Sequence, residues 1–186
     1  RKDRSKRRDH PELRGVGERC VVGFGSSGGP PMMNVLYNNH YQIVQSPGYV
    51  MIMAEMVHDA RIIRLDGKHP PENITPWLGD SIGHWEGNTL VVETTNFNPQ
   101  HTFRGGLRHF FAITSGAIVT ERFTRISKDQ ILYRFYIDDP DIYSQVWAGE
   151  MPLRSVEGKI YEYACHEGNY SMANILAGAR EEEKRR

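Results

Sequence analysis

The sequence has no excess of charge of either sign and no apolar stretch long enough to cross a membrane. Its 186 residues include 23 basic and 23 acidic side chains. A nucleic-acid-binding domain is expected to show a clear basic excess, so we expect no nucleic-acid partner. The longest apolar run, residues 49–57, is broken by Glu55 and falls short of the roughly 20 residues that span a bilayer, so we expect no membrane role. The first residues also lack the pattern of a secretory signal peptide.

The motifs that would indicate a nucleotide site are missing as well. Residues 23–28, Gly-Phe-Gly-Ser-Ser-Gly, match the letters of a dinucleotide-binding loop. No strand is expected before them and no helix after them, so residues 23–34 are predicted to be an ordinary loop. We therefore expect no organic cofactor.

Only two cysteines are present, Cys20 and Cys165, and their wide separation allows two interpretations. They form either a disulfide that ties the N-terminal region to the C-terminal one or two unrelated thiols, and we favour the disulfide. Closing so long a loop stabilises the folded state by restricting the unfolded chain. A disulfide implies an oxidising compartment, so the predicted location is secreted or periplasmic.

The distribution of charge divides the chain into an arm and one domain. Residues 1–19 carry eight Lys or Arg and four Asp or Glu, a net charge of +4, with few apolar side chains. This basic N-terminal arm is either solvated or wraps an acidic partner or a neighbouring subunit, in which case the protein would be a homo-oligomer. Residues 20–186 suffice for a single domain with its own core.

Short β-type runs separated by turn residues dominate this domain. One helix is expected at residues 169–186, because apolar side chains recur at helical spacing from Met172 to Ala179 and Asn169 or Ser171 can cap its start. An antiparallel meander closed into a calycin- or lipocalin-like barrel removes exposed edges and encloses a cavity. We predict this fold, with a two-sheet β-sandwich as the alternative. The nine predicted strands are residues 41–45, 49–58, 60–65, 83–86, 89–97, 117–126, 130–138, 144–153 and 159–165.

Several charged side chains lie within predicted strands that are otherwise apolar. Glu55 alternates with Tyr49 and Met53, and two other strands contain Glu93 and Glu121. An unpaired buried carboxylate is costly, so each acid must either pair with a cation on an exposed face or point into the barrel cavity. In the second case the residues expected to line a ligand cavity are Tyr49, Met53, Trp85, Glu93, Glu121 and Tyr133.

The densest polar cluster joins two predicted strands and contains Glu55, His58, Asp59 and Arg61. A histidine oriented by a carboxylate is a general base near neutral pH, and an arginine can stabilise a developing oxyanion. The alternative is an ordinary turn, in which Asp59 is a turn residue and His58 is only hydrogen-bonded.

A second cluster, His166 and Glu167, precedes the predicted helix. A helix N-terminus favours a neutral histidine and an ionised glutamate, so His166 is a candidate base and Glu167 a candidate partner. In the alternative interpretation Glu167 and Asn169 only cap the helix.

Metal-ligand residue types are present but scattered. They are His58, His84, Glu86, His166 and Glu167. No spacing among them resembles a metal-binding motif, so no metal is expected. If a metal were bound, its ligands would be His58, His166 and Glu167.

Four stretches are distinctive when they are taken together: YNNHYQIVQSPGYV (37–50), EMVHDARIIRLDG (55–67), WLGDSIGHWEGNTLVVETTNF (77–97) and YEYACHEGNYSMANILAGAR (161–180). They resemble a family of hypothetical, uncharacterised bacterial proteins that are β-rich and commonly bear secretion signals. The resemblance implies export but no activity, because none is attached to the family. His84 stands where members often have Arg. The matching positions are Glu55, His58, Asp59, Arg61, Trp85, Glu86, Glu121, Arg122 and residues 165–169.

Three classes of function follow from these features. The first is a cofactor-independent acid–base enzyme, a lyase, isomerase or hydrolase, that uses His58 or His166 on a small apolar or aromatic substrate. The second is a non-catalytic protein whose barrel binds a similar small molecule. The third is a structural or assembly component that links subunits through the basic arm. Convergence of both histidines with carboxylates in one cavity would favour the enzyme.

Overall fold

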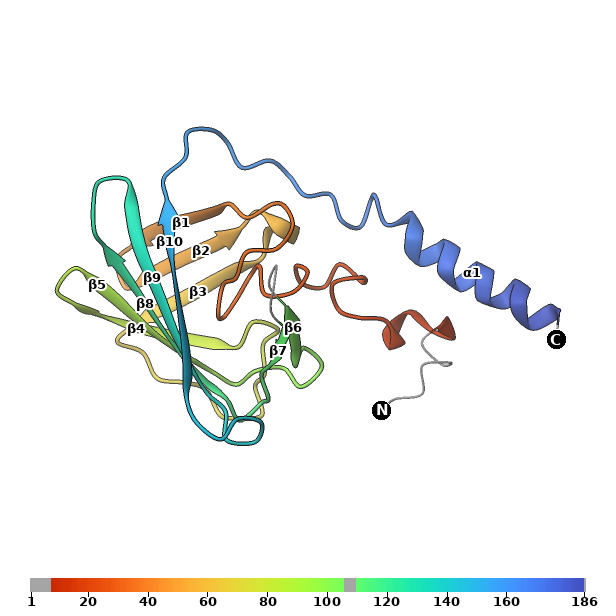
Figure 1. The fold of residues 1–186 in the computed structure, drawn as a ribbon, viewed down its shortest axis with the longest axis horizontal. Coiled ribbons are helices and arrows are strands. Elements are labelled where there is room, and N and C mark those ends of the chain that lie inside the picture. Colours follow the sequence, from red (N-terminus) through yellow and green to blue (C-terminus); the bar gives the residue numbers. More distant parts are fainter. Residues whose placement is uncertain (1–7, 106–109, 186) are drawn as a thin grey trace.

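The computed structural model describes residues 8–105 and 110–185, which are mainly β-structure (Figure 1). Eight strands form one sheet in the order β1-β2-β3-β4-β5-β8-β9-β10. They are β1 (Tyr41–Ser46), β2 (Tyr49–Ala54), β3 (Ala60–Leu65), β4 (Asp80–Glu86), β5 (Thr89–Thr95), β8 (Ile118–Arg125), β9 (Gln130–Asp138) and β10 (Trp147–Arg154). The remaining elements are the hairpin β6 (Phe103–Gly105) and β7 (Phe110–Ala112), the short 3-10 turns η2 (Pro11–Leu13) and η3 (Met56–His58), and helix α1 (Tyr170–Lys184).

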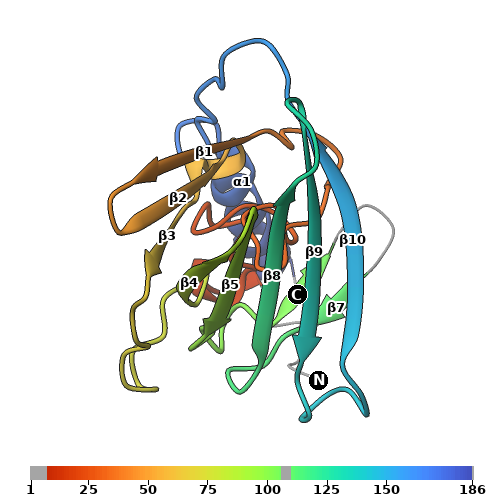
Figure 2. The same ribbon diagram turned by 90° about the vertical axis from the view of Figure 1, so that its left-hand side faces the viewer.

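The sheet curls strongly but does not close (Figure 2). Among the described residues, β1 pairs only with β2 and β10 only with β9. The predicted closed calycin- or lipocalin-like barrel is therefore wrong, and the sheet is a half-barrel. The two-sheet sandwich is not found either, since the second sheet of the described chain is only the hairpin β6–β7.

The prediction of a purely antiparallel meander is also wrong. Strands β3 and β4 pair in parallel, from Ile63–Ser81 to Leu65–Gly83. A parallel pair needs a connection that returns the chain to the same end of the sheet. The proline-containing loop at residues 66–79 makes this return.

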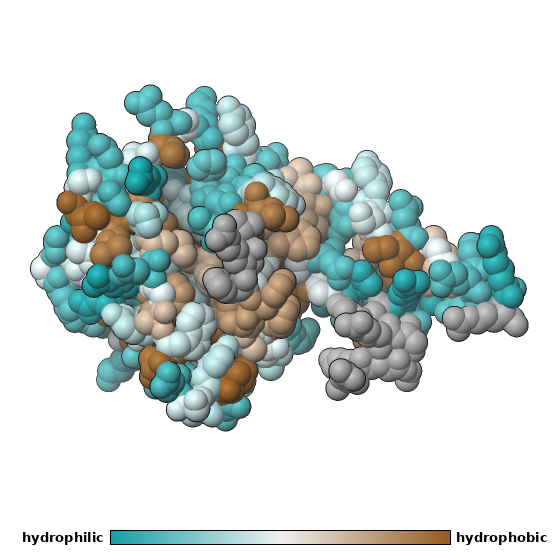
Figure 3. Space-filling model, viewed as in Figure 1, coloured by the Kyte–Doolittle hydropathy of each residue, from teal (hydrophilic) through white to brown (hydrophobic). Residues whose placement is uncertain are grey.

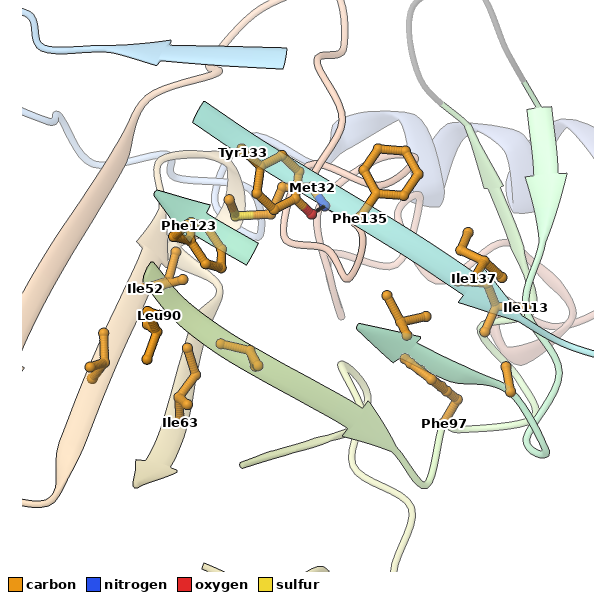
Figure 4. Close-up of a cluster of buried hydrophobic side chains, with 14 of the residues drawn as sticks. Met32, Ile52, Ile63, Leu90, Phe97, Ile113, Phe123, Tyr133, Phe135 and Ile137 are labelled. Carbon is orange, nitrogen blue, oxygen red and sulfur yellow. Dashed lines mark hydrogen bonds between the residues drawn. The ribbon is translucent and has the colours of Figure 1, made fainter. Parts of the chain in front are cut away.

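The concave side of the half-barrel is filled by the glycine-rich loop that precedes the sheet. We call residues 22–33 the plug. Met32 is 1% exposed, and its backbone N–H donates to the Tyr133 hydroxyl at 2.8 Å (Figure 4). The Tyr41 hydroxyl donates to the Ser27 carbonyl at 2.7 Å. Because the plug covers the inner face, the sheet buries its apolar side without closing.

The two faces of β2 are reversed relative to the prediction. Its inward residues are Val50, Ile52 and Ala54, whereas Tyr49 and Met53 lie on the outer face. The predicted inward orientation is wrong because Glu55, which sets the expected alternation, lies beyond the strand at the start of the next turn. Glu93 of β5 is also exposed on the outer face, between the buried residues Val92 and Thr94.

The predicted strand at residues 159–165 does not form, and this segment runs as an irregular connection from β10 to α1. The predicted helix is confirmed, with α1 beginning at Tyr170. Its capping residue is Asn169, whose side-chain oxygen accepts the Met172 N–H at 3.3 Å. No described helix is long and apolar enough to cross a membrane.

Residues 8–20 lie beside α1, and these two segments form an extension that projects from the half-barrel (Figure 1). Arg8 contacts Glu182 at 3.3 Å, and Arg180 contacts Asp9 at 3.4 Å. The visible surface of the extension is mainly hydrophilic (Figure 3). The described part of the basic arm therefore contacts the chain's own helix, while residues 1–7 lie outside the described residues.

Candidate functional site

A polar cleft of about 290 Å³ lies where the extension joins the half-barrel. The predicted disulfide between Cys20 and Cys165 is confirmed in its wall, with the two Cα atoms 5.7 Å apart. The cleft brings the two predicted catalytic clusters together from distant parts of the chain. Its lining residues are Cys20, Val21, Val57, His58, Asp59, Glu162, Cys165, His166 and Glu167.

The turn between β2 and β3 presents His58 and Asp59 to the cleft. Met56 anchors this turn, since its side chain is fully buried and its sulfur accepts the Phe24 N–H at 3.1 Å. Val57 and His58 have left-handed backbone conformations, with φ of 58° and 45°. A β-branched residue is strained in this region, and strained backbone is concentrated at functional sites. The buried side chains of Met56 and Val57 hold this strained conformation and fix the position of His58.

The Asp59 carboxylate lies against the backbone of the plug. Its Oδ2 atom accepts the Gly23 N–H at 2.6 Å. A Cβ atom at Gly28 would lie only 3.0 Å from the same oxygen, so this close approach depends on glycine. Burial raises the pKa of Asp59 to about 6, despite the opposing effects of the Gly23 hydrogen bond and of nearby His58. Asp59 is therefore ionised at neutral pH and more basic than an ordinary carboxylate, as a general base should be.

His166 and Glu167 reach the cleft from the segment that leads into α1. The disulfide at Cys165 and the contacts of Asn169 hold this segment in place. The Asn169 side-chain nitrogen donates to the Glu18 carbonyl at 2.8 Å, while its oxygen caps α1. Because Asn169 supplies the cap, the start of the helix does not depend on Glu167.

Two of the predicted catalytic residues, Glu55 and Arg61, do not line the cleft. Glu55 Oε2 lies 2.7 Å from His40 Nδ1. Burial alone would raise the pKa of Glu55, but hydrogen bonds from His40 and Asn38 outweigh burial and lower it. Glu55 therefore fastens the start of β1 to the end of β2.

Arg61 lies in the centre of the half-barrel, where it pairs with Glu121. Its Nη1 and Nη2 atoms donate to the two carboxylate oxygens at 2.6 and 3.1 Å. The Tyr133 hydroxyl donates to the same carboxylate at 2.5 Å. Glu121 and Tyr133 do point inward as predicted, but both are 0% exposed in a packed core and line no open cavity.

The other predicted ligand-binding residues are spread over the outside of the sheet. Trp85 is 46% exposed and Tyr49 is 49% exposed, while Glu93 is exposed and Met53 is half-buried. These four residues share no lumen with Glu121 and Tyr133, because the half-barrel, as far as the structure describes it, has none. A role for them in ligand binding stays a prediction.

The described residues contain no group of three or more His, Cys, Asp or Glu side chains placed to hold a metal ion. His58, His166 and Glu167 line one cleft but do not form such a group. His84 lies elsewhere, with its Nε2 atom 3.3 Å from Glu86 Oε1.

Sequence reasoning missed an ionic network on β3 and β4. Arg64 donates to both oxygens of Asp80, at 2.8 and 2.9 Å, and His69 Nδ1 lies 2.7 Å from Asp80 Oδ2. Burial alone would raise the pKa of Asp80, but Arg64 and His69 outweigh it and lower the pKa. The network fastens the 66–79 loop to the parallel strand pair. Its only signal in the sequence is an acid at the start of a strand.

Sequence reasoning also missed Glu162 as a lining residue of the cleft. The segment at residues 159–165 is predicted to be a strand, and nothing in that prediction distinguishes Glu162, which is exposed in the structure. The disulfide to Cys20 and the contact between Tyr163 and Tyr37 place Glu162 in the lining of the cleft.

The chain matches no protein-family model, no curated protein and no solved structure.

Proposed function

We propose that the protein is a cofactor-independent acid–base enzyme of the lyase, isomerase or hydrolase type, with the disulfide-walled cleft as its active site. The observation that carries this proposal is Asp59, a half-buried carboxylate that is hydrogen-bonded to the Gly23 N–H, has a pKa raised to about 6 and lines a cleft with two histidines. Strongly perturbed pKa values in clefts are enriched at catalytic sites.

In this proposal Asp59 accepts the proton, either from a substrate carbon or from a water molecule that attacks the substrate. His58 or His166, in its protonated form, donates a proton to the departing or rearranging group. Positioned acid–base groups of this kind contribute typically about 10²–10⁴-fold to a reaction rate. The strained backbone at Val57 and His58 supports the role of the turn as a positioned catalytic element.

The lining of the cleft favours a small polar substrate. Asp59, Glu162 and Glu167 contribute three carboxyl groups, and the volume of about 290 Å³ is at the lower limit of ordinary ligand sites. A substrate with a neutral or cationic polar group suits this lining better than the apolar or aromatic molecule expected from the sequence.

Hydrogen–deuterium exchange tests the proposal across many candidate substrates at once. The protein is incubated in D2O with a library of small amines, amino acids, hydroxy compounds and their esters, and proton NMR follows exchange or conversion of each compound. We expect the wild type to act on at least one compound and Asp59→Asn to act at least about 100-fold more slowly. Asp138→Asn, which alters an exposed acid at the end of β9, should keep the wild-type rate. Unchanged rates in the Asp59 variant, or no reaction with any compound, would refute the enzyme.

A second candidate function, non-catalytic binding, is favoured by a larger groove beside the cleft. This groove of about 540 Å³ shares the disulfide wall, and its lining includes Phe24, Tyr163, Met172 and Ile175. These side chains suit an apolar ligand. Saturable binding of an apolar fluorescent dye that Ile175→Asp abolishes, with no conversion of any compound, would support the carrier over the enzyme.

We also propose a secreted or periplasmic location. The disulfide is consistent with an oxidising compartment outside the cytoplasm. The sequence resemblance to exported bacterial proteins supports the same location.

A further inference from the structure

The interior of the half-barrel contains more positive than negative charge. Arg61 and Arg104 are both buried there, at 3% and 0% exposure. Among the described residues, Glu121 is the one carboxylate that faces them, and its oxygens already accept two hydrogen bonds from Arg61 and one from Tyr133. Within the part of the chain that the structure describes, the second guanidinium, Arg104, therefore has no carboxylate as a hydrogen-bond partner.

The other buried carboxylates of the described chain have partners elsewhere. Glu55 contacts His40, and Asp80 contacts Arg64 and His69. Asp139 accepts from the backbone and the side chain of one threonine, at 2.7 and 2.9 Å. The sequence at residues 106–109, Gly-Leu-Arg-His, supplies no carboxylate next to Arg104.

The hydrogen-bonding groups of the two guanidinium ions are also incomplete. Arg104 Nη1 donates to the Gly29 carbonyl at 2.9 Å, and the guanidinium lies 5.5 Å from the centre of the Phe97 ring. Arg104 Nε and Nη2 and Arg61 Nε are buried and have no partner among the described residues. Buried N–H groups of a charged side chain are costly to leave unsatisfied, so a ligand or water is required there.

We propose that the core of the half-barrel binds a small monovalent anion, a halide or a formate-sized carboxylate, between Arg104 and Arg61. Neither of the two surface clefts includes these arginines, so the site is separate from the proposed active site. Both arginines are buried in a packed core, so only a small ion could be accommodated between them. The bound anion supplies the missing negative charge and accepts from the unpartnered N–H groups.

The titration of neighbouring groups agrees with this geometry. Burial lowers the pKa of Arg104 to about 9, with repulsion from Arg61 adding to the effect. Burial also lowers the pKa of His101 to about 4, and the charge of Arg104 contributes. Burial is the main cause of both shifts, the second guanidinium adds to each, and Glu121 partly offsets the effect at Arg104.

Thermal unfolding in different sodium salts at one ionic strength tests the proposal. Bromide or formate should raise the unfolding temperature of the wild type along a saturating curve, by about 5 °C or more, because the anion binds only the folded state. The bulkier anion sulfate should give no saturating rise. Arg104→Met should lose the effect of bromide, whereas Arg134→Met, at an exposed ion pair with Glu150, should keep it.

Crystals of the wild type grown in bromide give a direct measurement that needs no variant to fold. We expect an anomalous peak within about 3.5 Å of Arg104 Nη2, and loss of this peak on soaking in formate would identify a carboxylate as the preferred ligand. A water molecule at this position with no anomalous signal, together with no saturating anion effect, would overturn the proposal. A bromide peak found only at the protein surface would also overturn it.

Discussion

The half-barrel and the extension are held together by different forces. In the half-barrel, several contacts between distant residues are buried, such as the Arg61–Glu121 pair and the hydrogen bond from Met32 to Tyr133. In the extension, α1 has a single buried residue, Ala179, and its ion pairs with the N-terminal segment lie on the surface. Burial stabilises the first region, whereas the disulfide and the hydrogen bond from Asn169 to Glu18 join the two segments of the second.

The candidate active site lies between these two differently stabilised regions. Asp59 belongs to the half-barrel, where the plug backbone fixes its carboxylate. His166 and Glu167 lie in the segment that leads into α1, next to the disulfide at Cys165. The position of Asp59 is therefore fixed by the half-barrel, whereas the positions of His166 and Glu167 depend on the contacts that hold the segment before α1.

The largest expected effect comes from breaking the core of the half-barrel. Glu121→Gln removes the charge that compensates Arg61 and should cost about 3–5 kcal/mol of unfolding free energy, since it leaves an unpaired buried charge. Urea denaturation measures this loss. Glu86→Gln removes a carboxylate that contacts Arg122 on the surface at 2.7 Å and should leave the midpoint unchanged. Equal effects of the two substitutions would show that the buried pair is not what stabilises this region.

Removing the disulfide should release α1 and the segment before it from Cys20. In the chain-entropy model, closing a loop of 145 residues contributes about 5 kcal/mol. We expect the double variant Cys20→Ser/Cys165→Ser to become sensitive to proteolysis at residues 155–169 while the sheet at residues 41–154 stays protected, because the extension detaches first. Limited proteolysis with mass spectrometry tests this. Simultaneous cleavage of both regions would mean that they form one cooperative unit.

A smaller effect, and one that depends on pH, is expected at the boundary itself. The pKa of Asp59 rises from 3.8 to about 6 on folding, so the folded state binds more protons than the unfolded state between these values and loses stability as the pH rises. Asp59→Asn removes this loss. The variant should be more stable than the wild type by up to about 3 kcal/mol above pH 7 and equal to it near pH 4. Thermal unfolding at the two pH values measures the difference, and a variant that is less stable at pH 7 would contradict the raised pKa.

The smallest effect is expected within the extension. Arg180→Ala removes exposed contacts with Asp9 and Glu183, which are worth less than about 1 kcal/mol. Circular dichroism should show unchanged helix content and an unchanged unfolding midpoint while the disulfide is intact. A large loss of helix would show that surface ion pairs, and not the disulfide, hold α1 in place.

Local patterns predict most of the elements of this fold correctly. The strand pairs around Gly48 and Gly87 follow from turn residues between alternating apolar runs, and α1 follows from its spacing and its Asn169 cap. The open form of the sheet is not predictable in this way, because the plug covers the inner face and an irregular glycine-rich loop carries no periodic signal. The parallel pairing of β3 with β4 depends on the path of the 66–79 loop, which residue preferences do not specify.

The candidate site is predictable only in part. The residue types at His58, Asp59, His166 and Glu167 indicate acid–base chemistry, and the two cysteines indicate how distant segments meet. The role of Gly23 and Gly28 against the Asp59 carboxylate is not predictable, because it arises from a tertiary contact of backbone atoms. The outward direction of Tyr49 and Met53 is missed because the prediction includes Glu55 in the strand. Glu55 lies beyond the end of β2, so it does not show which face of the strand is buried.

The position of the plug in the chain also determines when the core can form. Residues 22–33 leave the ribosome before every strand that encloses them. The Met32 N–H therefore lacks its hydrogen-bond acceptor until Tyr133, 101 residues later, has been synthesised. The partner of Arg61 follows 60 residues after it, and Cys20 must wait for Cys165. Early segments with such late partners cannot reach their final environment during synthesis, so the newly made N-terminal third remains accessible to chaperones until most of the chain exists.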